Sequence, residues 1–183
     1  GTRDLLTGVM DLELANFELG RAPQLLARLP LVDSESATVG GNLHFERAGE
    51  EIETTGNLVL AGLNIDHPLL ARAPVKGVGF RAELKASLNP GQESVRVESL
   101  RIAREAVELQ LEGALRWPED VGGRSVSGTF PMPSTPCQAV LESIPDQLIP
   151  GLRDLTLKGE MAVDLRAEVD MANLDALELS GSV

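Results

Sequence analysis

The sequence predicts a mainly β protein built from long, curled antiparallel strands. Three segments, 109–115, 155–161 and 177–183, repeat the pattern Leu-x-Leu-x-Gly-x-apolar. Each alternates apolar and polar residues, which is typical of a strand with one apolar face and one solvated face. The shared glycine falls on the apolar side, where it marks a bend or a close approach. We expect a half-barrel or a sandwich-like sheet, with two or three short helices as plugs.

The same alternation predicts the other strands and their turns. The strands lie at 39–45, 78–88, 95–102 and 107–117. A turn at Ala48-Gly49-Glu50 leads from the first of these to a strand that begins at Ile52, and Asn89-Pro90-Gly91 closes a hairpin. Pro118 ends the fourth strand, because proline cannot donate to a strand ladder.

Three slips in the alternation predict β-bulges. The apolar phase changes between Leu14 and Phe17, between Leu60 and Leu63, and again near Glu98-Ser99. One extra residue in one strand of a pair shifts the phase in this way.

The longest alternation runs from Leu155 to Met171, with apolar residues or glycine at all odd positions. At about 3.3 Å per residue, a strand of this length would reach roughly 55 Å. Strands are usually five or six residues long. We therefore expect either one long, bent strand or two strands in series.

Helical signals are short and few. Segments 23–29 and 68–73 both contain Leu-Leu-Ala-Arg and are followed by proline, and they predict two copies of one helical plug. The third helix should begin at Ser134 or Thr135 as its N-cap and place Pro136 in its first turn. Its apolar face would carry Cys137, Val140, Leu141 and Ile144.

Composition and length predict one domain with an aliphatic core. The chain has 183 residues, of which 43% are hydrophobic and only 3% aromatic. This length suffices for a single core. We expect one β-rich domain at 1–183, with a possible division into a β-repeat region at 1–130 and a helix with a long hairpin at 131–183. Because the strand pattern is still running at Val183, we expect the chain to be a fragment of a longer parent.

The charge of the chain disfavours anionic partners. The formal net charge of −12 repels phosphate backbones and anionic headgroups, so nucleic acid is not expected as a partner. No stretch approaches the roughly 18 apolar residues of a membrane helix, and no leader peptide pattern opens the chain. Membrane contact is expected only through an anchor in the parent.

The residues that could carry catalysis or bind metal do not form a recognisable site. His44 and His67 have no second ligand at zinc spacing. The acidic pairs Glu50-Glu51 and Glu119-Asp120 fall in predicted turns, where solvation explains them. A hydrolase built on these turns is a further alternative, and it would lose activity on mutation of Glu50 or Glu119. Neither Gly-x-Ser-x-Gly nor Ser-x-x-Lys occurs around Ser134 and Ser143 or elsewhere. We expect no enzyme activity, cofactor or metal in this segment.

Cys137, the single cysteine, has two interpretations. On the apolar face of a short helix it would be a small buried hydrophobic residue. In an oxidising compartment it could instead form a disulfide with a cysteine of the parent chain outside this segment.

Two stretches resemble known families. The stretch from Gly56 to Trp117, with its one-sided hairpins and a Pro-Leu-Leu-Ala-Arg plug, resembles the β-groove repeats of AsmA/TamB-type envelope proteins. The resemblance implies a lipid-binding or lipid-transport groove. Its possible apolar face would be formed by Leu109, Leu111, Leu115, Leu157, Met161, Val163 and Leu165.

The stretch from Pro133 to Val183 reads Pro-Ser-Thr-Pro-Cys-Gln-Ala-Val-Leu-Glu-Ser-Ile-Pro, then Leu-x-Leu-x-Gly, then Asp-Met-Ala-Asn-Leu-Asp-Ala-Leu. It is similar to the non-catalytic β-rich region of transglycosylase, class A penicillin-binding-like proteins of myxobacterial type. In that family the region accompanies a membrane-anchored peptidoglycan glycosyltransferase domain outside the cytoplasm. The catalytic motifs of that family are absent here, so no catalytic residue is carried over.

The second resemblance implies a non-catalytic accessory domain in the periplasm or cell envelope, within a parent anchored in the inner membrane. Its partners would be other domains of the parent, cell-wall synthesis proteins or lipid. It also favours the disulfide interpretation of Cys137. The two functions differ in one physical respect, which is whether the apolar face of the sheet is packed shut or open.

Overall fold

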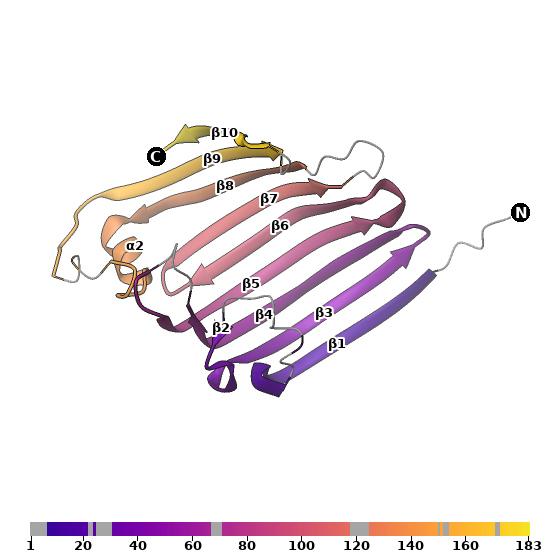
Figure 1. Ribbon diagram of the computed structural model, residues 1–183, viewed down its shortest axis with the longest axis horizontal. Coiled ribbons are helices and arrows are strands. Elements are labelled where there is room, and N and C mark those ends of the chain that lie inside the picture. The colour runs from indigo at the N-terminus through magenta and orange to yellow at the C-terminus, as the bar shows by residue number, and fades with distance from the viewer. Residues whose placement is uncertain are drawn as a thin grey trace, which may run out of the picture.

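A single curled sheet forms the body of the molecule (Figure 1). The computed structural model describes residues 7–21, 24, 31–66, 71–117, 125–149, 151, 154–170 and 173–183, with the backbone alone for 173–177. Its strands are β1 (Thr7–Glu18), β2 (Leu31–Val32), β3 (Thr38–Ala48), β4 (Glu51–Ile65), β5 (Val75–Asn89), β6 (Ser94–Arg104), β7 (Val107–Arg116), β8 (Ser125–Pro136), β9 (Glu160–Asp170) and β10 (Asn173–Ser182).

All strand pairs are antiparallel, and the order in the sheet follows the chain from β1 and β3 to β10, with the short β2 beside the end of β4. The prediction of a mainly β fold with a curled antiparallel sheet is confirmed. The half-barrel is the form observed, because the described strands make one sheet rather than two facing sheets. Strands before and after residue 130, the possible division considered above, belong to this one sheet.

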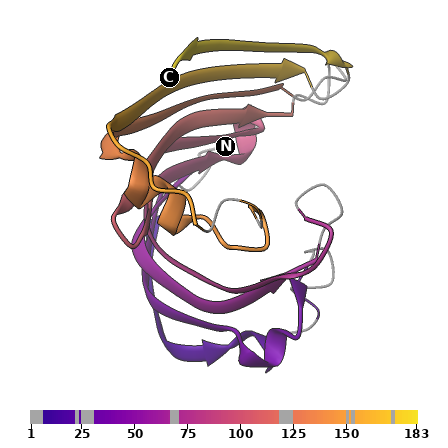
Figure 2. The same cartoon turned by 90° about the vertical axis from the view of Figure 1, so that its left-hand side faces the viewer.

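The sheet curls into a C-shaped trough with an open mouth (Figure 2). The C-terminal strands form one limb of the C and the N-terminal strands form the other. The α-helix α2 (Cys137–Ser143) lies at one end of the trough in both views. The chain after α2 extends across the middle of the C at that end (Figure 2).

All three predicted bulges are confirmed. The pairing of β1 with β3 shifts between Leu14 and Phe17, and that of β4 with β5 shifts between Leu60 and Leu63. In β6, Glu98 is the extra residue between Ser99 and Val97, which pair with consecutive residues of β5. Each bulge restores the apolar residues to the same face of the sheet, which is why the phase slip is visible in the sequence.

Gly41 shows how closely the strands β3 and β4 approach each other. Gly41 in β3 has φ +130°, a backbone conformation that is essentially restricted to glycine. A Cβ at this position would overlap the carbonyl oxygen of Asn57 in β4. Gly41 therefore supplies both a conformation and a space that other residues lack.

The predicted hairpin turn at Asn89-Pro90-Gly91 is confirmed. The chain makes a 3-10 turn, η3 (Pro90–Gln92), between β5 and β6. The side-chain oxygen of Asn89 accepts a hydrogen bond from the Gln92 N–H at 3.0 Å. Pro90 occupies the first position of the turn, where its fixed φ is favourable.

The strand prediction for Leu155–Met171 is wrong at its start. Residues 155–158 have no regular structure and β9 begins only at Glu160, while residue 171 lies outside the described residues. The Leu157 N–H donates to the side-chain oxygen of Gln138 in α2 at 2.9 Å. This bond holds the segment against the helix, and Gly159, with φ +101°, then turns it into the sheet.

The third predicted helix exists, but its predicted N-cap is wrong. The β8 strand continues to Pro136, which takes the N-cap position of α2. The Thr135 hydroxyl donates to the Pro133 carbonyl at 2.8 Å, and the Ser134 hydroxyl donates to the Glu160 carboxylate at 2.6 Å. Neither hydroxyl is therefore directed to the helix N-terminus.

The other two predicted helices lie largely outside the described residues. Of segment 23–29 only residue 24 is described, and it is helical. Of segment 68–73 only residues 71–73 are described, and they are not helical. Two further 3-10 turns, η1 (Leu19–Arg21) and η2 (Ser34–Ser36), lie on either side of β2.

Candidate functional site

The strand register gathers apolar side chains on one face of the sheet. Starting from Leu12 in β1, each residue is the direct cross-strand partner of the next. This row consists of Leu12, Leu43, Gly56, Leu84, Leu100 and Leu111. A second row lies two residues away and consists of Leu14, Gly41, Leu58, Ala82, Ile102 and Leu109. We call the face that carries these rows the inner face.

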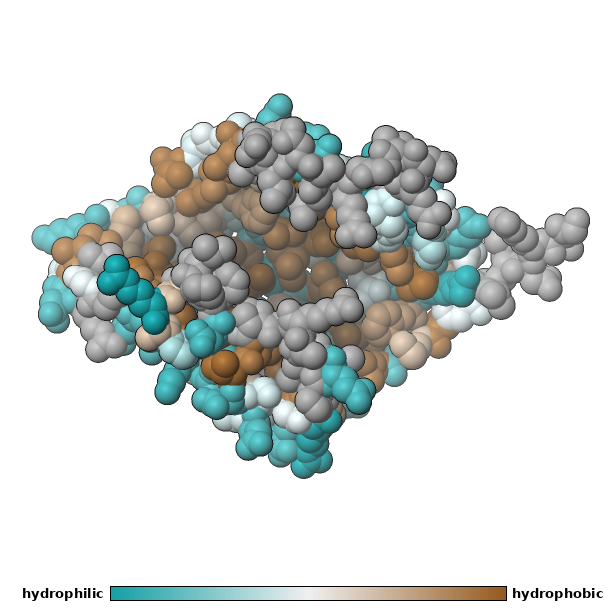
Figure 3. All heavy atoms as spheres, viewed as in Figure 1, coloured by the Kyte–Doolittle hydropathy of each residue, from teal (hydrophilic) through white to brown (hydrophobic). Residues whose placement is uncertain are grey.

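The inner face is the concave face of the trough. Figure 3 looks into the mouth, and hydrophobic residues line the hollow while hydrophilic residues gather at its margin. The register continues the apolar face into the C-terminal limb, where Phe130 pairs with Leu165 and Met132 pairs with Val163. The trough is therefore apolar over both limbs.

The described residues leave most of this apolar face uncovered. The chain exposes 12839 Å² of solvent-accessible surface, about one and a half times the roughly 8,500 Å² of a compact monomer of 19.5 kDa. None of the large side chains described is fully buried, and Leu109 on the inner face is 48% exposed. Domains normally bury the apolar face of a sheet against another layer. The described residues supply no such second layer over most of this sheet.

Buried apolar side chains are found mainly at one end of the trough. Among the described residues, the buried apolar ones are Ala37, Leu63, Val75, Ala82, Val107 and Met132. All except Ala82 lie at the strand ends on one side of the sheet, because consecutive antiparallel strands reverse direction there. The helix α2 contacts β7 and β8 at this same end. Buried apolar side chains thus gather at the α2 end, and along the rest of the trough the described residues leave the inner face uncovered.

This distribution predicts different losses of stability for two truncations to alanine. Met132→Ala, at a site only 5% exposed, should lower the free energy of unfolding by about 2–4 kcal/mol, because it leaves a cavity in the packed end. Leu115→Ala, at a site 36% exposed, should cost about 1 kcal/mol or less, since water already reaches it. Denaturant unfolding of both variants checks this, and equal losses would contradict a trough closed at one end only.

The structure places the residues predicted for the groove as follows. By register Leu109, Leu111, Leu115, Met161, Val163 and Leu165 belong to the inner face. Leu157 does not, because it precedes β9 and lies against α2.

The sequence-based site omitted the N-terminal half of the inner face. Leu43, Leu84 and Leu100 complete the first row. Their parity becomes readable once the alternation is followed through each bulge. The signal was therefore present in the sequence, in the same form that identified the C-terminal residues.

The opposite, outer face is polar and carries cross-strand ion pairs. His44 Nδ1 lies 2.7 Å from Asp11 Oδ1, and Arg101 lies 3.9 Å from Glu108. Glu98, the bulge residue, pairs with Lys85 and raises the pKa of that ammonium group, first through the hydrogen bond and then through its charge. These side chains are solvent-exposed, where such pairs contribute little to stability. The outer face is therefore a solvated surface.

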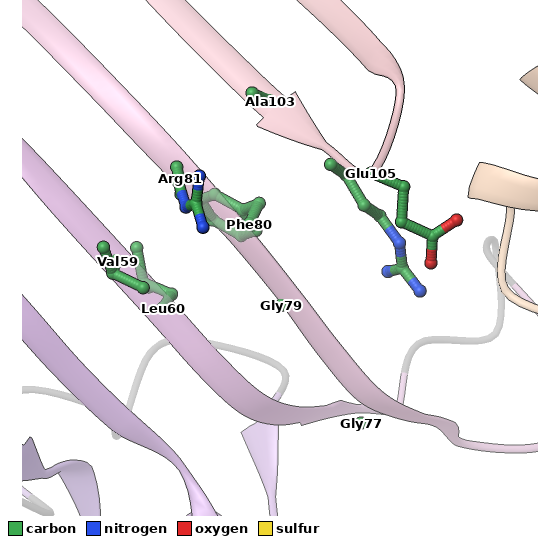
Figure 4. A pocket seen from close by; sticks show the side chains of 9 residues that line it. Val59, Leu60, Gly77, Gly79, Phe80, Arg81, Ala103 and Glu105 are labelled. Atoms are coloured by element: carbon green, nitrogen blue, oxygen red, sulfur yellow. The ribbon is translucent and has the colours of Figure 1, made fainter. Parts of the chain in front are cut away.

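A small cavity of about 410 Å³ lies beside the start of β5 (Figure 4). The pairing of β5 with β6 ends at Arg81 and Ala103, and Gly77 and Gly79 leave space where side chains would stand. Its nine lining residues include Arg81 and Glu105 but no histidine, serine or cysteine. The cavity has no nucleophile paired with a base, as covalent catalysis would need.

The other candidate residues are dispersed. His44 pairs with Asp11, Glu50 and Glu51 lie at the turn into β4, and the Ser143 hydroxyl donates to the Val140 carbonyl at 2.7 Å. His67, Glu119 and Asp120 lie outside the described residues.

Cys137 is half-buried at the start of α2 and forms no disulfide with a described residue. The described part of the chain has no cluster of three or more histidine, cysteine, aspartate or glutamate residues able to hold a metal ion. It also contains no helix with the length and apolar character to cross a membrane.

Comparisons with known protein families, curated proteins and solved structures found no match to this chain.

Proposed function

We propose that this chain shelters the acyl chains of lipids in its apolar trough. The observation that supports this most strongly is the inner face that the described residues leave uncovered, where Leu12 and Leu109 are exposed and the other leucines of the two rows are half-buried. Soluble monomers rarely leave a large contiguous apolar surface uncovered, and such surfaces mark binding sites. A flexible hydrocarbon chain suits the trough, because the described inner face is mostly aliphatic and offers few polar groups for orienting a polar ligand.

The shape of the trough supports an elongated ligand. Hydrophobic residues line an elongated hollow (Figure 3), and buried apolar side chains pack at its α2 end. An acyl chain lying along the inner face would have its headgroup in solvent at the mouth. The net charge of −12 favours zwitterionic or neutral headgroups over anionic ones.

The proposal agrees with the resemblance of residues 56–117 to AsmA/TamB-type groove repeats. As part of this proposal, we place the protein in the cell envelope. The accessory role beside a peptidoglycan glycosyltransferase stays a prediction. The two roles are compatible, because a non-catalytic module of an envelope protein can also hold lipid.

Native mass spectrometry tests the proposal. The chain, purified without detergent from a lipid-containing host, is expected to retain adducts with the masses of single- or double-chain lipids. Adding phosphatidylcholine to the delipidated protein should restore one such adduct. A chain that stays free of adducts after both treatments would contradict the proposal.

A further inference from the structure

The strand β1 is an open edge of the sheet. It pairs with β3 on one side, and no described strand pairs with its other side (Figure 1). In an antiparallel pair, alternate residues direct their N–H and C=O groups away from the partner. The unpaired edge of β1 therefore presents a row of backbone donors and acceptors. This row is continuous from Thr7 to Leu14, where the pairing with β3 is regular.

Apolar side chains on β1 are unusually exposed. Val9 is 65% exposed and Met10 is 57% exposed. Met10 and Leu12 belong to the inner face and are covered on one side only, by Phe45 and Leu43 of β3. Natural edge strands are commonly protected by lysine or proline, and β1 contains neither. A further strand at this edge would cover these side chains.

The outer face of the same strand is acidic. Asp11 and Glu13 alternate with the apolar residues, and β1 has no basic residue. The Asp11 side chain is 78% exposed although its carboxylate meets His44. Oppositely charged residues directly across two strands attract, and like charges repel. The charge pattern thus specifies the polar side of an incoming strand as basic.

We propose that β1 is a docking edge for an extended segment of another protein in which apolar and basic residues alternate. The segment would add a strand to the sheet, a known mode of peptide recognition. Its apolar residues would extend the inner face beyond Met10 and Leu12, and its lysines or arginines would face Asp11 and Glu13. This docking edge borders the lipid trough, because Leu12 belongs to the inner face, but docking does not require lipid to be bound.

In the register centred on Leu12, the charges disfavour a second copy of this chain as the occupant. An antiparallel pairing of two β1 strands centred on Leu12 would place Asp11 of one copy opposite Glu13 of the other, twice. Pairing with the opposite edge, β10, would bring its Glu178 toward the same acidic strand. The pairing of β10 with β9 is also irregular between Asn173 and Glu178, so β1 is the more regular edge.

A peptide as long as β1 in which leucine and lysine alternate tests the proposal, with a leucine-glutamate peptide as its counterpart. Binding to the full chain is measured by fluorescence anisotropy, and backbone pairing is measured by amide hydrogen exchange. We expect the lysine peptide to bind and to protect outward-facing amides of β1. The double substitution Asp11→Lys with Glu13→Lys should weaken its binding on the order of tenfold or more, because two attractions become repulsions.

The matched control is Asp164→Lys with Glu168→Lys, which makes the same change of net charge on exposed positions of β9, a strand that lies inside the sheet. This variant should bind the lysine peptide as the unmodified chain does. Equal weakening by both double variants, equal binding of the glutamate peptide, or protection of β10 in place of β1 would each overturn the proposal. Dimerisation that protects β1 without peptide would also overturn it, in favour of a second copy.

Discussion

Replacing Leu100 by aspartate is expected to weaken acyl-chain binding by about a hundredfold or more, while the free energy of unfolding falls by only about 1–2 kcal/mol. Leu100 lies in the middle of the first inner-face row, between Leu84 and Leu111. A bound chain would lose its contact there and would remove water from a carboxylate, which costs several kcal/mol. Leu100 is half-buried, so without lipid the carboxylate would still reach water and the fold should tolerate it.

The adjacent Ser99→Asp variant is the control, because Ser99 is exposed and has the opposite parity. It should leave lipid binding unchanged. Calorimetric titration with a single-chain zwitterionic lipid measures the affinity, and denaturant unfolding measures the stability. If Leu100→Asp unfolded the chain outright, as a charge in a closed core would, the trough would be a packed interior.

The substitution Gly41→Ala should lower the free energy of unfolding by about 3 kcal/mol or more. A φ of +130° is strained by about 1–3 kcal/mol for an L-residue. The new methyl group would also overlap the Asn57 carbonyl, and overpacking adds a similar cost. The strands β3 and β4 would have to separate, which would flatten the curl.

The substitution Gly8→Ala is the matched control. Gly8 lies in β1, and nothing is within 4 Å of a Cβ placed there. Its effect on the free energy of unfolding should be close to zero. Thermal and denaturant unfolding of the two variants provide the comparison. A Gly41 variant as stable as the Gly8 variant would show that the curl does not depend on close approach at this glycine.

Much of the fold could be predicted because strand burial has a period of two residues. The bulges near Leu14, Leu60 and Glu98 are visible in the sequence because each has an apolar residue on both sides that must return to the same face. The same rule identified Leu109, Leu111 and Leu115 as one face.

The start of β9 could not be predicted in this way. Residues 155–158 follow the strand alternation, but a tertiary hydrogen bond from Leu157 to Gln138 holds them against α2. The local alternation of apolar and polar residues gives no information about that contact. The N-cap of α2 failed for a related reason, because the Ser134 hydroxyl bonds to Glu160, 26 residues away.

The openness of the candidate site also lay beyond the sequence. Parity determines which side chains share a face, and the same parity is compatible with a closed sandwich or an open trough. The distinction depends on what lies opposite that face, here α2 at one end of the sheet and solvent over much of the remainder. Exposed inner-face residues such as Leu109 became recognisable only with the strands in place.

Paramagnetic broadening by a nitroxide-labelled, zwitterionic single-chain lipid tests most directly whether the inner face is open and receives acyl chains. With methyl-labelled protein, the resonances of Leu84, Leu100 and Leu111 are expected to broaden as the lipid is added. The Val59 methyls, at an exposed position of opposite parity in β4, should stay sharp. Unchanged leucine signals, or broadening of Val59 to the same extent, would contradict the account.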